Sequence, residues 1–225
     1  MTNTTANLKS LATIKSFQLE MLTPDQVAVI KSTVAKGATD VELQWFLYQA
    51  HELGLNPLTK EIWFIKRVKK VKGAGQYGKW EYPRLPNGQI DYSNAELVIM
   101  TSKDGYFKKA TENPEFMSVQ SMEIRENDEF EMEFDGEKMK VKKHAWKAKD
   151  RGKIISAWAV ATYKDGSKDW NFIAFDEYCQ SYEGKPTGVW ANNPSAMIKK
   201  CAETPLLKKA ARLSGITTAE EMEHV

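Results

Sequence analysis

The chain has 225 residues, of which 42% are hydrophobic and 28% charged, as is ordinary for a globular protein that buries a core. It contains no run of 18 apolar residues, residues 1–10 are polar, and two cysteines and three scattered histidines are too few for a disulfide framework or a zinc site. These features predict no membrane span, argue against secretion, and indicate a cytoplasmic protein without a metal or other cofactor.

Two helices are expected near the start of the chain. Thr23 suits the N-cap of the first helix, Pro24 suits its first turn, and Gln26 completes a capping box with Thr23. The spacing of apolar residues predicts that this helix ends near Gly37 and that a second helix covers residues 40–53.

The middle of the chain has the alternating apolar pattern of β-strands. We expect three hairpins, formed by residues 62–71 with 89–100, 119–125 with 130–134, and 154–163 with 169–175. A short helix at residues 106–112 and a strand at residues 138–146 are also expected. A helical region follows at residues 194–213, and Pro205 is expected to interrupt it because proline lacks an amide donor.

The order of these elements predicts an α+β fold. Antiparallel hairpins are flanked by a helical N-terminal part and a long C-terminal helical region. We expect a single core domain at residues 23–215, preceded by a flexible leader at residues 1–22 and followed by a short tail at residues 216–225.

Charged residues are clustered, although the net charge is only +2. Residues 112–137 hold ten acids and one base, and residues 138–153 hold eight bases and one acid. Adjacent blocks of opposite sign favour a hairpin whose solvated face pairs acids with bases. The alternative is that each block produces a local field that attracts a partner.

One stretch comes close to a phosphate-binding loop. Gly73, Gly78 and Lys79 have the required spacing, but Trp80 stands where Ser or Thr must hold magnesium. The flanking residues also lack the buried strand and the helix that such a loop needs. We therefore expect no ATP binding.

An enzyme is the less favoured hypothesis. No nucleophile or histidine base stands in a recognisable context. Asp135 and Glu137 could hold a metal ion, with Lys138 beside it, in a metal-dependent nuclease, yet the same residues suit a turn between two strands. We expect a protein that is not a catalyst.

Two basic stretches with aromatic residues suit single-stranded nucleic acid, which needs cations for its phosphates and flat side chains for its bases. Residues 60–80 hold seven bases and one acid, and residues 190–212 combine Trp190 with a second group of bases. For the first stretch alone, an edge strand protected by lysines explains the pattern equally well.

Three segments resemble the phage single-strand annealing recombinases of the RecT/Red beta family. They are residues 54–62 (GLNPLTKEI), residues 102–106 (SKDGY) and the run from residue 188 to residue 216. The resemblance implies ATP-independent binding of single-stranded DNA and annealing of complementary strands in phage-type homologous recombination. It also implies rings or helical filaments of many copies in the cytoplasm of a bacterial host.

The resemblance and the charge pattern together nominate DNA-binding residues. Basic positions of the family's motifs match Lys60, Lys199, Lys200 and Lys208, whereas Arg67 and Arg212 are nominated by charge and placement. Trp190 is either a stacking platform for a base or a core residue.

Partners and alternatives follow from the same comparison. The expected partners are single-stranded DNA, annealed duplex and further copies of the chain, with a phage exonuclease and a host single-strand-binding protein as candidates. The family's C-terminal extension, which docks partner proteins, is short or missing here. A metal-dependent DNA nuclease and a scaffold protein that self-assembles without DNA remain as alternatives.

Overall fold

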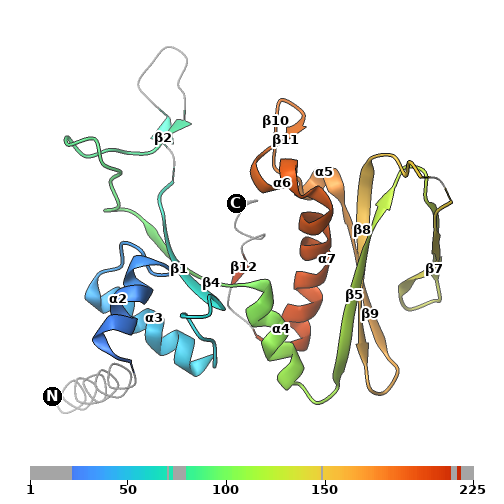
Figure 1. Ribbon diagram of the computed structural model, residues 1–225, viewed down its shortest axis with the longest axis horizontal. Coiled ribbons are helices and arrows are strands. Elements are labelled where there is room, and N and C mark those ends of the chain that lie inside the picture. The colour runs from blue at the N-terminus through green and yellow to red at the C-terminus, as the bar shows by residue number, and fades with distance from the viewer. Residues whose placement is uncertain (1–21, 70, 73–79, 148, 214–216, 219–225) are drawn as a thin grey trace. The chain divides into compact units, whose positions relative to one another are not determined.

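Figure 1 shows the computed structural model of the protein, which describes residues 22–213 except 70, 73–79 and 148, together with residues 217 and 218. The chain divides into two compact units, Met1–Ser102 and Lys103–Val225, and each has its own hydrophobic core. Helices and antiparallel sheets occur in both units, which confirms the α+β prediction. Within these described residues, no helix has the length and apolar character that a membrane crossing requires.

The first unit consists of two helices and a small antiparallel sheet. Its elements are α2 (Pro24–Ser32), α3 (Asp40–Glu52), β1 (Ile62–Arg67), β2 (Val71–Lys72), β3 (Trp80–Glu81) and β4 (Glu96–Thr101). The predicted capping box is confirmed, since the Gln26 amide donates to Thr23 Oγ1 at 3.2 Å and the Thr23 amide donates to Gln26 Oε1 at 2.9 Å. The expected leader lies outside the described residues except for Leu22.

The pairing of β1 with β4 confirms the first predicted hairpin. The register runs from Ile62 opposite Thr101 to Arg67 opposite Glu96. Alternation along β1 turns Ile62 and Phe64 toward the helices, where both are almost fully buried. Phe64 meets Phe46 of α3 edge to face, with the ring centroids 6.0 Å apart, so the strand and the helix share one core.

The second unit is built on a three-stranded antiparallel sheet with strand order β5-β8-β9. Its elements are α4 (Lys103–Glu112), β5 (Phe116–Arg125), β6 (Glu129–Phe134), β7 (Met139–Ala145), β8 (Ile154–Tyr163), β9 (Lys168–Ala174), α5 (Phe175–Tyr178), β10 (Ser181–Tyr182), β11 (Lys185–Pro186), α6 (Gly188–Asn192), α7 (Pro194–Ala210) and β12 (Thr217–Thr218). The long helix α7 lies along one face of this sheet, and α4 packs beside it (Figure 1).

Small residues on the central strand let α7 approach the sheet closely. Ala157, Ala159 and Ala161 alternate along β8, are fully buried, and belong to the same core as Ile198 and Leu207 of α7. The β8–β9 hairpin confirms the predicted pairing, and Gly166 in its turn has a φ of 83°, which glycine adopts without strain.

The expected hairpin between residues 119–125 and 130–134 is wrong. Strand β5 instead pairs with β8, along a ten-residue strand that carries much of the core, whereas β6 pairs with β7. The turn between β6 and β7 supports their pairing, because Asp135 Oδ1 accepts from the amides of Glu137 (3.1 Å) and Lys138 (2.9 Å).

Opposite charges face each other along the β6–β7 ladder, as the charge blocks predicted. Glu131 stands opposite Lys143 and Glu133 stands opposite Lys140, and Lys143 also lies 2.5 Å from Glu129. These groups are largely exposed, so the pairs contribute little stability but do favour this register.

The expected interruption at Pro205 is also wrong, since α7 continues through this residue to Ala210. Proline removes one hydrogen bond from the helix and crowds the preceding turn. However, Pro205 is exposed, whereas its neighbours Thr204 and Leu206 are buried. Burial of the apolar face of α7 offsets the local cost of the proline.

Candidate nucleic-acid interface

A hollow of about 570 Å³ lies in the second unit at the β5 edge of the sheet. Three lysines from α4 and α7 line it, together with amide, hydroxyl, apolar and aromatic side chains from β5 and β8. Its lining is Lys103, Val119, Gln120, Ser121, Met122, Trp158, Ala196, Lys199, Lys200 and Glu203, and we call it the lysine hollow. It gathers three cations at one edge of the sheet, as a surface for a phosphate backbone requires.

The helical repeat explains why α7 supplies four of these residues. Ala196, Lys199, Lys200 and Glu203 are spaced by three or four positions and therefore share one side of the helix. Ile198 lies on another side and is fully buried in the core. Packing of the apolar side thus fixes the direction in which both lysines extend.

Largely buried carboxylates pair with Lys103 and Lys199 of the lysine hollow. Lys103 forms an ion pair with Glu203, and Ser121 donates a hydrogen bond to the same carboxylate. Lys199 Nζ lies 3.9 Å from Glu123 Oε2. Glu123 and Glu203 are largely buried, so these carboxylates fix the positions of the lysines.

Glu123 remains charged despite its burial. Burial by itself raises the pKa of this carboxyl, but hydrogen bonds and the nearby charges of Lys199 and Arg151 outweigh that effect and lower the pKa below its ordinary value. Arg151 Nη1 lies 3.3 Å from Glu123 Oε1. The carboxylate therefore keeps its hold on Lys199 at neutral pH.

A chain of hydrogen bonds fixes Trp158 at the lysine hollow. Its indole Nε1 donates to His144 Nδ1 at 3.0 Å, and His144 Nε2 lies 3.0 Å from Asp128 Oδ2. An indole can only donate, so a neutral His144 carries its proton on Nε2 and donates it to Asp128. Arg151 in turn donates to both oxygens of Asp128, at 2.8 and 2.6 Å.

In the first unit, Lys60 lies on a loop whose residues are hydrogen-bonded to one another. The Asn56 amide donates to Glu61 Oε2 at 2.8 Å, Asn56 Oδ1 accepts from the Leu58 amide at 2.9 Å, and the Glu61 amide donates to Asn56 O at 3.1 Å. Asn56 therefore shapes the turn from helix to strand. Lys60 is exposed on this loop with a φ of 60°, in the left-handed region.

Three nominated basic residues remain, namely Arg67 in the first unit and Lys208 and Arg212 in the second. Arg67 is half-buried at the end of β1, opposite Glu96. The described lining of the lysine hollow does not include Lys208, which lies about 80° around the helix from Lys200, or Arg212, which follows α7. Both remain proposed contacts rather than members of the hollow.

Trp190 belongs to the hydrophobic core. Its side chain is 1% exposed, and its ring meets that of Phe175 at a centroid distance of 5.7 Å. This geometry favours the core interpretation of Trp190 over stacking on a base.

Two residues of the lysine hollow were missed as binding residues. Lys103 lies in the SKDGY segment, where it was assigned only to a helix start. Trp158 lies in an apolar strand and was assigned to structure, although its alternation with the buried Ala157 and Ala159 was a signal that it faces away from the core of α7.

The two remaining site hypotheses are a metal site and a nucleotide-binding loop. No group of three or more His, Cys, Asp or Glu side chains is placed to hold a metal ion in that part of the chain. Asp135, a candidate nuclease ligand, uses Oδ1 in the β6–β7 turn. The near match to a phosphate-binding loop at residues 73–79 lies outside the described residues.

The fold and the lysine hollow define an α+β protein with a cationic, aromatic surface suited to a polyanion. Residues 20–225 match the RecT family, and the chain therefore belongs to this family. Membership indicates a role in phage-type DNA recombination by single-strand annealing, with single-stranded DNA as the ligand. No curated protein matches the chain.

Proposed function

We propose that this protein binds single-stranded DNA by its phosphate backbone and anneals complementary strands without ATP, as a ring or helical filament of many copies. The observation that supports the proposal most is the lysine hollow, in which Lys103, Lys199 and Lys200 come together from α4 and α7. Family membership supports the same ligand.

The charge of the lysine hollow suits reversible binding of DNA. Three lysines line it, but Glu203 also lines it and Glu123 pairs with Lys199, so the cations are partly neutralised. A lysine ammonium has three donors and can bond a carboxylate and a phosphate at once. The positive field is therefore enough to attract a backbone and too weak to fix it permanently.

Annealing then follows because the surface leaves the bases of the bound strand free to pair. Contacts to phosphates carry no sequence information, so the bases of the bound strand stay available for pairing. A second strand samples registers on this surface, and each correct base-pair step adds about 1.4 kcal/mol of stacking. Wrong registers lack this gain and dissociate.

Lys60, Arg67, Lys208 and Arg212 are proposed as further backbone contacts. Lys60 and Arg212 are exposed, and both have a positive φ (60° and 54°), so the backbone turns sharply at each of them. In an assembly, a strand that leaves one lysine hollow passes to that of the next copy, which makes binding cooperative along the DNA.

The test mixes two complementary oligonucleotides, labelled with a donor and an acceptor fluorophore, with the protein in the absence of ATP and magnesium. Faster duplex formation than in buffer is expected, and the variant Lys199→Gln/Lys200→Gln should lose most of this acceleration. Lys164→Gln/Lys168→Gln, with the same charge change at the β8–β9 turn, should retain it. Degradation after magnesium addition would indicate a nuclease, and self-assembly without any effect on the oligonucleotides would indicate a scaffold.

A further inference from the structure

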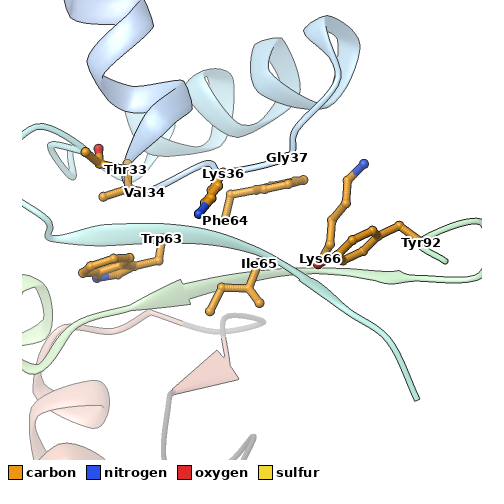
Figure 2. Close-up of a pocket in the computed structure, with 9 residues that line it drawn as sticks. All are labelled: Thr33, Val34, Lys36, Gly37, Trp63, Phe64, Ile65, Lys66 and Tyr92. Atoms are coloured by element: carbon orange, nitrogen blue, oxygen red, sulfur yellow. The ribbon is translucent and has the colours of Figure 1, made fainter. Parts of the chain in front are cut away.

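A second hollow, of about 650 Å³, runs along β1 in the first unit (Figure 2). Its lining is Thr33, Val34, Lys36, Gly37, Trp63, Phe64, Ile65, Lys66 and Tyr92, and we call it the edge hollow. Among the described residues, β1 has a strand partner on the β4 side and none in the first unit on the side of the hollow. There the Phe64 amide donates to Val34 O at 2.8 Å.

A rigid turn presents Lys36 to the edge hollow. Val34, Ala35 and Ala38 around it are at most 4% exposed, whereas Lys36 itself is exposed. Gly37 has a φ of 79°, and a Cβ built on it would meet nothing within 4 Å, so the space above the turn is open. No acidic side chain of the described residues pairs with Lys36, so its charge is available to a ligand.

The second lysine of the edge hollow is already engaged. Lys66 Nζ lies 2.8 Å from Glu42 Oε2, and both side chains are mostly buried. Glu42 also accepts from the Thr39 amide at 2.7 Å, as part of the capping box of α3. Lys66 therefore contributes its aliphatic stem to the wall, and Lys36 is the cation that faces the solvent.

Tyr92 is the exposed aromatic ring of the edge hollow, at 50% exposure. Trp63 is half-buried and packs against the core of the first unit, and its ring lies on the opposite side of β1 from Lys36 and Phe64 (Figure 2). No described group bonds the Tyr92 hydroxyl. An exposed ring and a cation in one hollow suit a nucleotide, whose base is flat and whose phosphate is charged.

We propose that the edge hollow is a second subsite for single-stranded DNA, in which Tyr92 takes a base and Lys36 takes a phosphate. The proposal rests on the function proposed above and adds a base-stacking contact to the backbone contacts of the lysine hollow. An extended peptide that adds to β1 is less favoured, because a lysine beside an open strand edge opposes strand addition.

Photo-crosslinking tests the subsite on the full chain. Oligothymidine that carries 5-bromodeoxyuridine is bound, irradiated and digested, and the crosslinked peptide is identified by mass spectrometry. We expect a crosslink at Tyr92. Tyr92→Leu should abolish the Tyr92 crosslink and weaken binding about fivefold, the lower end for one stacked base. Tyr182→Leu, at a ring that is 71% exposed in the second unit, is the matched control.

Lys36→Gln supplies an independent measurement. The loss of one phosphate contact should lower the slope of log affinity against log salt by about 0.7. If oligothymidine binds, Lys199→Gln/Lys200→Gln weakens it, and yet Tyr92→Leu and Lys36→Gln change neither crosslinks nor affinity, the subsite is refuted while the proposed function stands. If the chain binds no oligothymidine at all, both proposals fail.

Discussion

Glu203 is the residue at which the lysine hollow predicts a gain rather than a loss of DNA binding. Its carboxylate pairs with Lys103 and accepts from Ser121, and its side chain is 12% exposed. Glu203→Gln keeps the shape and the hydrogen bond from Ser121 but removes the negative charge. Lys103, which is 34% exposed, then offers its full charge to a phosphate.

The size of the gain follows from counterion release. One additional neutralised phosphate adds about 0.7 to the slope of log affinity against log salt for a single strand. If the gain vanishes near 1 M salt, it amounts to about fivefold tighter binding at about 0.1 M. The opposite sign separates this variant from the losses that local misfolding produces.

Fluorescence anisotropy of labelled oligothymidine, measured across a salt series, provides the readout. Glu177→Gln is the control, because it makes the same charge change at an exposed position on α5. Equal gains in both variants would show a long-range effect of net charge. Unchanged or weaker binding by Glu203→Gln, with circular dichroism and Tm preserved, would refute a phosphate contact at Lys103.

Three further predictions concern the same unit. Lys199→Gln/Lys200→Gln should reduce the magnitude of the salt slope by about 1.4 for oligothymidine and for mixed sequences alike, whereas a change in one sequence only would indicate base readout. Asp128→Asn should lower the free energy of unfolding by about 1.5–3 kcal/mol in urea titrations, because it removes the charge from one of the two carboxylates that pair with Arg151 and leaves only Glu123, and a loss below about 1 kcal/mol would contradict that role. The hydrogen bonds of Arg151 hold the pKa of Asp128 far below its ordinary value of 3.8. The stability that this carboxylate contributes is therefore present above pH 3.8 and is lost as the pH falls toward the folded pKa. Acid titrations of the wild type and of Asp128→Asn should consequently converge at low pH. Trp190→Phe should lower Tm and leave the salt slope unchanged, since the indole is buried, and a loss of crosslinking or affinity without a loss of stability would restore Trp190 as a DNA contact.

Local signals in the sequence were sufficient for the helix starts and the tight turns. Thr23 and Gln26 lie three residues apart, and the capping box that they form depends on no distant residue. The β8–β9 turn is equally local, with Asp165 Oδ1 accepting from the Ser167 amide at 2.9 Å. Such elements can be predicted because both partners of each bond are neighbours in the chain.

Pairing between distant strands could not be predicted in the same way. Strand β5 finds β8 across the whole β6–β7 hairpin, and the choice depends on which partner buries more apolar surface. Pro205 is a comparable case, since the cost of the proline is local and the packing that offsets it comes from the sheet. The nominated lysines of α7 were found from charge, whereas Lys103 joined them only through the packing of α4 against α7.

The three alanines of β8 determine the distance between α7 and the sheet, and so they also set the width of the lysine hollow. A branched side chain at Ala159 would have to push the helix outward, at a cost of about 1–3 kcal/mol. Lys199 and Lys200 would move with the helix, away from Ser121 on β5. Mutations of the β8 alanines should therefore change the DNA affinity of this protein, although no nucleotide contacts their methyl groups.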